Sequence, residues 1–266
     1  MSGMTRVALA LWLAGGTLLA ADRGVSALDG WPVPIPVQMP YEAPPKPETS
    51  PDTSVAPSNQ PLGPEELQRA EALVPLLEGK QEFWAMGEFV HLGPPAVPVL
   101  TKALKMPGTR IRYNAIETLL MIKDPSAVPA LLDVAKEPGE MPRIREHALR
   151  AAVRLDPAAV PPAIEVMAKD VNASIRKVAA FEARYVRQRA VVPVLIGLLS
   201  DDERFVGISA VSSLWLLTRH DTEMHDWDAS SKQDRLEWAQ EWIEWWNANQ
   251  ETFQLPEPRK PRKPPS

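Results

Sequence analysis

The chain of 266 residues contains no cysteine. It therefore has no disulfide bonds, no lipid-bearing N-terminal cysteine and no cysteine-ligated zinc or iron–sulfur centre. It also lacks a Gly-x-Ser-x-Gly elbow, a phosphate-binding loop, a dinucleotide fingerprint and a His-Glu-x-x-His pair. The net charge of −5 argues against a general attraction to nucleic acid or anionic membranes. From these absences we expect a protein that is not an enzyme, binds no metal or cofactor and is stabilised by packing alone.

The first residues have the form of a secretory signal peptide. Arg6 precedes an apolar run from Val7 to Ala21, whose 15 residues are fewer than the roughly 20 that a membrane-spanning helix needs. The small-x-small triplet ending at Ala27 fits a cleavage site better than Ala20 and Ala21 do. We therefore predict a signal peptide over residues 1–27, export to the periplasm or the extracellular space, and no membrane span after cleavage. A buried N-terminal helix is the alternative.

Residues 28–64 form a proline-rich segment. Proline recurs so often after Trp31 that the backbone donors of a β-ladder are missing. We expect a disordered, extended linker, or alternatively a docking peptide anchored by Trp31 and Tyr41.

Two short motifs then recur through the chain. The first is built on Ala-Val-Pro, and its prolines lie 31, 32 and 32 residues apart, at Pro98, Pro129, Pro161 and Pro193. The second has the form Ile/Val-Arg-x-x-Ala, and its copies lie 33, 31 and 31 residues apart, starting at Ile111, Ile144, Ile175 and Val206. Self-similarity at such a period predicts a solenoid of stacked antiparallel helix pairs, and hence an all-α fold.

The segment boundaries follow from these motifs. We place the repeats at 65–219, an acidic loop and a final helix at 220–252, and a basic, proline-rich, disordered tail at 253–266. The predicted helices span residues 65–79, 82–92, 96–106, 110–122, 126–137, 142–154, 158–169, 173–187, 190–200, 203–219 and 231–252.

The paired motifs and the short turn between them resemble HEAT repeats of the bacterial type that is also found in phycobilisome lyases. The resemblance covers roughly residues 65–219 and implies a HEAT-like α-solenoid, but it is much less specific about a role. Two positions depart from the pattern. Gly207 stands where an arginine is expected, and the acidic turn residue occurs only as Asp170 and Asp201. An Asp–Arg ladder between the repeats is therefore expected to be incomplete.

Arg112, Arg145 and Arg176 occupy the second position of the second motif. We expect these arginines to stabilise repeat stacking by pairing with turn acids or carbonyls, and the four motif prolines to contribute to the same stacking. A binding stripe of arginines is the alternative. Residues 142–189 contain ten Lys/Arg against five Asp/Glu. We expect most of these basic residues on the first helices, on the convex side of the stack, which argues against a nucleic-acid groove.

The final predicted helix carries four tryptophans within an arc of about 100°. They are Trp238, Trp242, Trp245 and Trp246. A terminal repeat must close the apolar end of a solenoid, so we predict a capping helix. The helix resembles the ends of other exported bacterial HEAT-like proteins, which supports the cap. An open aromatic platform for sugars or peptides is the alternative.

The histidines of the chain are candidate metal ligands. The loop with His220 and His225 gathers carboxylates, yet its spacing matches no metal motif. His91 and His147 fall within predicted helices and are interpreted as structural.

Taken together, these features predict an exported, non-catalytic HEAT-repeat scaffold or adaptor that binds a protein partner through its concave second-helix surface. The main alternative is a module that binds an envelope glycan or polymer through exposed tryptophans and the basic tail. An enzyme resembling the bilin lyases and a HEAT-like DNA glycosylase are disfavoured, because the first would need a carboxylate-lined pocket and a cytosolic location, and the second a basic concave channel.

Overall fold

The computed structural model describes residues 60–220 and 225–257, and every regular element in these ranges is helical. The predicted signal peptide, nearly all of the linker and the end of the basic tail lie outside the described residues. The α-helices are α1 Pro64–Leu73, α2 Glu82–Leu92, α3 Val97–Ala103, α4 Thr109–Ile122, α5 Val128–Lys136, α6 Pro142–Leu155, α7 Pro161–Met167, α8 Ala173–Val186, α9 Val191–Leu198, α10 Arg204–Thr218 and α11 Lys232–Asn249. Short 3₁₀ turns occupy Val74–Leu77, Pro94–Ala96, Pro125–Ala127 and Pro157–Ala159.

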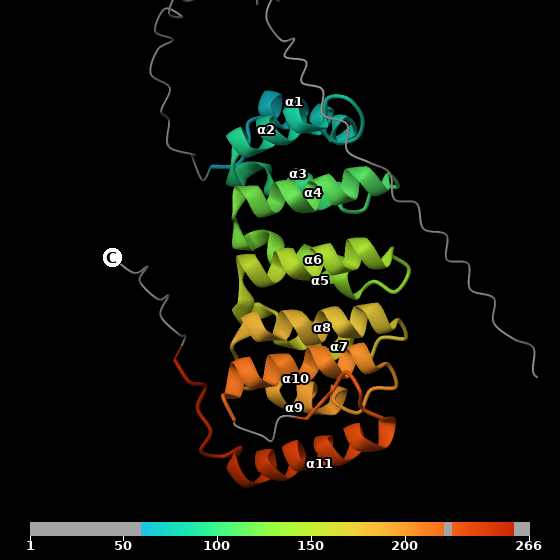
Figure 1. Ribbon diagram of the computed structural model, residues 1–266. Coiled ribbons are helices and arrows are strands. Elements are labelled where there is room, and N and C mark those ends of the chain that lie inside the picture. Colours follow the sequence, from blue (N-terminus) through green and yellow to red (C-terminus); the bar gives the residue numbers. More distant parts are fainter. Residues whose placement is uncertain (1–59, 221–224, 258–266) are drawn as a thin grey trace, which may run out of the picture. The chain divides into compact units, whose positions relative to one another are not determined.

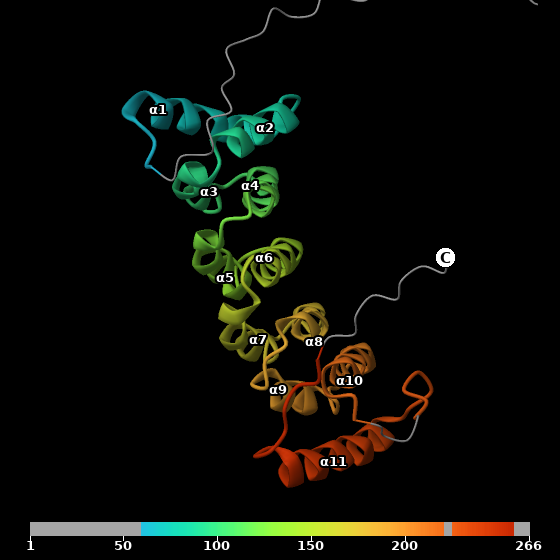
Figure 2. The ribbon, with the colours of Figure 1, turned by 90° about the vertical axis from the view of Figure 1, so that its left-hand side faces the viewer.

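The helices form two layers. Figures 1 and 2 place α1, α3, α5, α7 and α9 in one layer and α2, α4, α6, α8 and α10 in the other. Within the second layer α4 packs on α6, α6 on α8 and α8 on α10, while α11 lies across the end of the stack against α9. The prediction of an all-α solenoid of stacked helix pairs is confirmed.

The motif prolines all lie in the first turn of a first-layer helix. Pro98, Pro129 and Pro161 occupy the first two positions of α3, α5 and α7, and Pro193 is the third residue of α9. The first backbone N–H groups of a helix have no intrahelical acceptor, so proline costs little there. The first helix is shorter than the predicted range 65–79. It ends at Leu73, and a 3₁₀ turn containing Pro75 follows.

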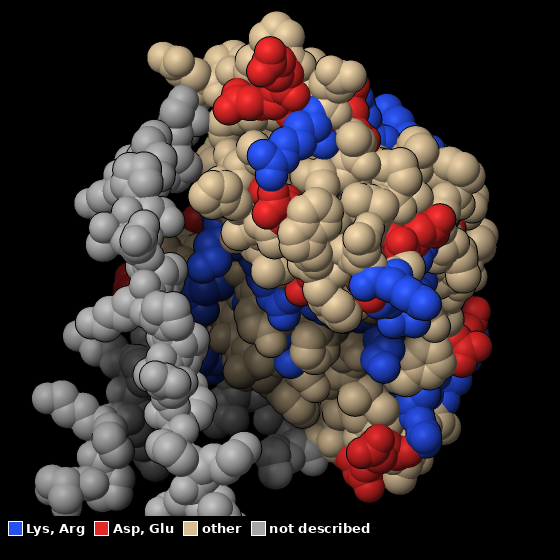
Figure 3. Space-filling view, turned by 90° about the horizontal axis from the view of Figure 1, so that it is seen from above, with Lys and Arg blue, Asp and Glu red and all other residues tan. Residues whose placement is uncertain are grey.

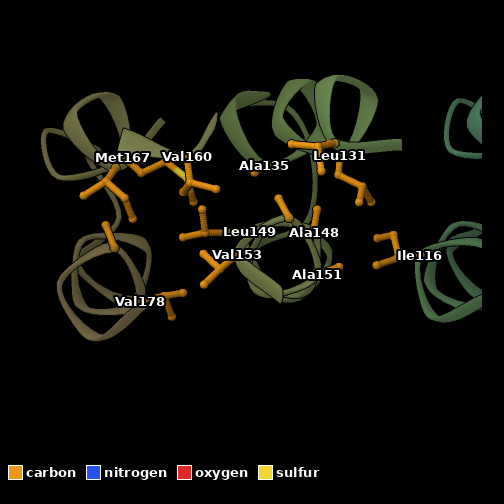
Figure 4. Close-up of a cluster of buried hydrophobic side chains, with 14 of the residues drawn as sticks. Ile116, Leu131, Ala135, Ala148, Leu149, Ala151, Val153, Val160, Met167 and Val178 are labelled. Atoms are coloured by element: carbon orange, nitrogen blue, oxygen red, sulfur yellow. The ribbon is translucent and has the colours of Figure 1, made fainter. Parts of the chain in front are cut away.

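The alanines of the second motif explain how closely the helices approach. Ala115, Ala148, Ala179 and Ala210 are fully buried in α4, α6, α8 and α10. Figure 4 shows the core around α6, where Ala148 lies toward Leu131 and Ala135, and Leu149 lies toward Val160. The core is thus one continuous strip along the stack rather than a single centre.

Among the described residues no helix combines the length and apolarity needed to cross a membrane.

Candidate functional site

The three motif arginines connect consecutive repeats. Arg112 Nε lies 2.6 Å from Glu140 Oε2, Arg145 Nη2 lies 2.5 Å from Asp170 Oδ2, and Arg176 pairs with Asp201 at 2.7 Å. These contacts favour the structural interpretation over a binding stripe.

Each of these arginines also donates to backbone carbonyls. Arg145 Nε donates to the Ala135 carbonyl at 2.9 Å, and Arg176 Nη1 donates to the Asp170 carbonyl at 2.8 Å. Burial raises the pKa of the Asp170 carboxyl, but hydrogen bonds from Arg145 and a backbone N–H outweigh it, and the net pKa is lowered. The hydrogen bond to Asp201 raises the pKa of Arg176. Arg176 therefore stays charged while it links two repeats.

The expectation of an incomplete ladder needs correction at Glu140. This residue takes the place of the turn aspartate for Arg112. A glutamate reaches the guanidinium from a different position in the turn, so alignment of aspartates alone misses it. The fourth copy of the motif has glycine, Gly207, in place of the arginine, so it makes no such ion pair. A larger residue does not fit there, because a Cβ on Gly207 would lie 2.8 Å from the Leu199 carbonyl oxygen.

The tryptophans of α11 differ in exposure. Trp242 and Trp246 are buried at 1% and 8% exposure, and Trp238 and Trp245 are partly buried against the core. The His225 ring stacks on Trp238 with centroids 4.3 Å apart. These positions agree with a cap at the end of the stack.

The two loop histidines belong to this aromatic cluster. The His220 ring stacks on Trp245 at 4.4 Å, and His225 Nε2 lies 3.2 Å from Glu241 Oε2. In residues 60–220 and 225–257 no group of three His, Cys, Asp or Glu side chains is placed to hold a metal ion. The loop therefore has a packing role in the part of it that is described.

The second-helix layer presents a different kind of surface, which we call the second-helix face. It consists of the outward side chains of α4, α6, α8 and α10. One row on it repeats the spacing of the second motif, 33, 31 and 31 residues, through Met121, Arg154, Tyr185 and Leu216. All four are exposed, the three apolar or aromatic ones at 47%, 54% and 57%. Because α4, α6, α8 and α10 pack side by side, this row runs across four successive helices.

Aromatic rings and basic side chains are held against one another on this face. The Arg184 guanidinium lies 4.0 Å from the centroid of the Phe181 ring, and the Arg143 guanidinium lies 5.1 Å from the Tyr113 ring. Tyr113 also stacks on His147 at 4.4 Å. These contacts restrict the rings before any partner binds.

The charge of the second-helix face corrects one prediction. Arg143, Arg150 and Arg154 lie on α6, and Lys177 and Arg184 lie on α8. Most basic residues of 142–189 are therefore on the second helices, not on the first. The prediction that they lie on the first helices was wrong. These basic residues occur in the same segments as the Ile-Arg-x-x-Ala motif, so the sequence already places them on the second helices. The charge argument against a basic second-helix surface therefore fails.

Other parts of the surface carry mixed charge. Figure 3, viewed from the α1–α2 end, shows acidic and basic side chains next to each other. A hollow of about 660 Å³ beside α3 and α5 has the ion pair of Arg112 with Glu140 in its lining.

Residues 83–153 match the family model of HEAT repeats. The architecture is an all-α, HEAT-like solenoid. Among solved structures, the complex of CpcE and CpcF of phycocyanin lyase from Nostoc sp. PCC7120 is similar at 21% identity and a TM-score of 0.47, over 55% of this chain and 98% of that one. No curated protein sequence matches this one at a significant level.

The expectation that the protein is not an enzyme is corrected by this comparison. A solenoid of similar fold occurs in a complex described as a phycocyanin lyase.

Proposed function

We propose that this protein is a HEAT-repeat scaffold that binds a protein partner through the second-helix face. The observation that carries the proposal is the exposed row of Met121, Arg154, Tyr185 and Leu216, repeated in register across four helices. A solenoid offers such a face as an extended binding surface, because each repeat adds one ridge to it.

The composition of the face supports a protein partner. Aromatic residues, methionine and arginine are enriched at protein–protein interfaces, and tyrosine and arginine are frequent among the residues that dominate binding energy. Tyr185, Phe205 and Leu216 are 54%, 40% and 57% exposed. The cation–π contact between Arg184 and Phe181 keeps the ring in place, which lowers the entropy lost on binding.

The tryptophans of α11 give less support to glycan binding. Trp242 and Trp246 are buried, and rings from His225 and His220 stack on Trp238 and Trp245. A sugar would have to displace these rings before it stacked on an indole face.

Export is part of the proposal, and it rests on Arg6 and the apolar run from Val7 to Ala21. Mass spectrometry of the protein from its own cell should find an N-terminus between Ala21 and Leu28. An intact Met1 in a cytosolic fraction would contradict export without affecting the binding face.

The binding face is tested by photocrosslinking in the envelope fraction of the source organism. A crosslinking amino acid is placed at Tyr185 on α8, and in a matched variant at Val166, which is 53% exposed on α7 in the other layer. The proposal expects a discrete protein adduct from position 185 that disappears in a Phe205→Ala, Leu216→Ala background. An adduct of the same protein from position 166 alone would overturn it.

A further inference from the structure

The second helices end in an unusual way. The residues directly after α4, α8 and α10 are Lys123, Arg187 and Arg219, and each has a left-handed backbone with φ of 61°, 49° and 53°. Glycine is the usual residue at such a helix end, and other residues are strained there. Arg154 adds a basic residue to the last turn of α6. We call Lys123, Arg154, Arg187 and Arg219 the basic edge.

The basic edge has few partners of opposite charge. Arg187 and Arg219 donate to the backbone carbonyls of Pro256 and Glu257, and neither forms an ion pair in the part of the chain that the structure describes. Within residues 60–220 and 225–257, Lys123 and Arg154 form no ion pair.

Two acids follow the second helices directly. Asp124 and Asp156 come after α4 and α6, and their carboxylates accept the backbone N–H groups of Ser126 and Ala158 and form no ion pair with the basic edge among the described residues. The helix dipole also favours cations at these C-terminal ends, but it does not require the strained backbone.

Apolar surface adds to this edge. Met121, Tyr185 and Leu216 lie in the last turns of α4, α8 and α10 and are exposed beside the basic residues. Positive charge and apolar surface are thus brought together at one end of the second-helix face.

We propose that the basic edge binds a protein segment rich in aspartate and glutamate and interspersed with leucine or aromatic side chains. This inference rests on the proposed function and names the chemistry of its partner. Four helices at roughly 8–10 Å spacing span about 25–30 Å, which an extended segment of about eight or nine residues covers.

A polypeptide fits this surface better than a nucleic acid does. Met121, Tyr185 and Leu216 make three of the four row positions apolar or aromatic, and a phosphate backbone has no groups that use such positions. An amphipathic acidic segment uses both the charges and the apolar positions.

The test measures fluorescence anisotropy of a labelled 20-residue peptide with alternating Glu/Asp and Leu/Phe positions, added to the mature full chain. Three matched probes are a peptide with Lys in place of every acid, a peptide with the acids but with Ser in place of the apolar residues, and a 20-nucleotide single-stranded DNA. A double variant, Lys123→Ala with Arg154→Ala, is compared with Lys102→Ala plus Lys169→Ala, which removes the same charge from side chains 73% exposed on the first-layer side.

We expect the acidic, apolar peptide to bind most tightly and the edge variant to weaken it about fivefold or more, at up to about 1 kcal/mol for each exposed charge pair. The control variant should stay within about twofold, because distant exposed charges are screened in salt.

Equal loss in both variants, or equal binding of the Lys peptide, would overturn the inference. Tighter binding of the DNA would overturn it in favour of a nucleic-acid surface. A photocrosslinker at Tyr185 separates the two proposals. Capture of the Lys peptide at this position would refute the acidic partner but keep the second-helix face, whereas peptide adducts only from position 166 would refute both.

Discussion

Replacing Trp242 by alanine should loosen the C-terminal end of the solenoid. Trp242 is 1% exposed and lies edge-on to the rings of His220 and Trp245 at 5.2 and 5.6 Å. Truncating a buried aromatic costs about 3–5 kcal/mol, through lost transfer free energy and the cavity that remains. For a domain of this size, that corresponds to a drop in melting temperature of about 6–20 °C.

The assay is urea unfolding with hydrogen exchange of the same samples. Since each repeat contacts only its neighbours, the loss of protection should be largest in α9 and α10 and smallest in α2 and α4. Ile243→Ala is the matched control, because Ile243 is adjacent on α11 but 39% exposed, and it should cost about 1 kcal/mol or less. An unchanged midpoint in Trp242→Ala, with loss of ligand binding, would refute the capping role.

Three further outcomes are expected from the same unfolding assay. Arg145→Ala should destabilise the fold by about 3–5 kcal/mol because Asp170 loses its buried partner, and Arg145→Lys should recover only part of this loss. If both variants were as stable as the unchanged protein, the ion pairs between repeats would not stabilise the stack. Gly207→Ala should cost about 1–3 kcal/mol through its clash with the Leu199 carbonyl, and no change would mean that the backbone relaxes freely. Burial lowers the pKa of His147 despite the nearby Glu117, so the unfolded chain binds the proton more readily and stability should fall as pH drops below about 6.5; His147→Gln should lose this dependence, and an unchanged profile would contradict it.

The fold could be predicted because its signals are local and repeated. The prolines and the buried alanines recur at nearly constant spacing, and each has one physical role that does not depend on distant residues. Gly207 could be recognised as a departure from the pattern, but its reason, the approach of the Leu199 carbonyl, appears only in three dimensions.

The candidate site could be predicted only in part. Glu140 was missed because the turn that carries it differs in shape from the turn at Asp170. The left-handed ends at Lys123 and Arg187 were also missed, because basic residues in the last turn of a helix are ordinarily explained by the helix dipole. Exposure decides which side chains are available to a partner, and helix register alone does not give it at Tyr185.

The central claim is that the second-helix face is the binding surface, and paired photocrosslinking from Tyr185 and Val166 tests it most directly. Both positions are more than half exposed, at 54% and 53%, and they lie in opposite layers of the stack. We predict an adduct with one partner protein from position 185 and none from position 166. The same adduct from both positions, or from position 166 only, would contradict the account.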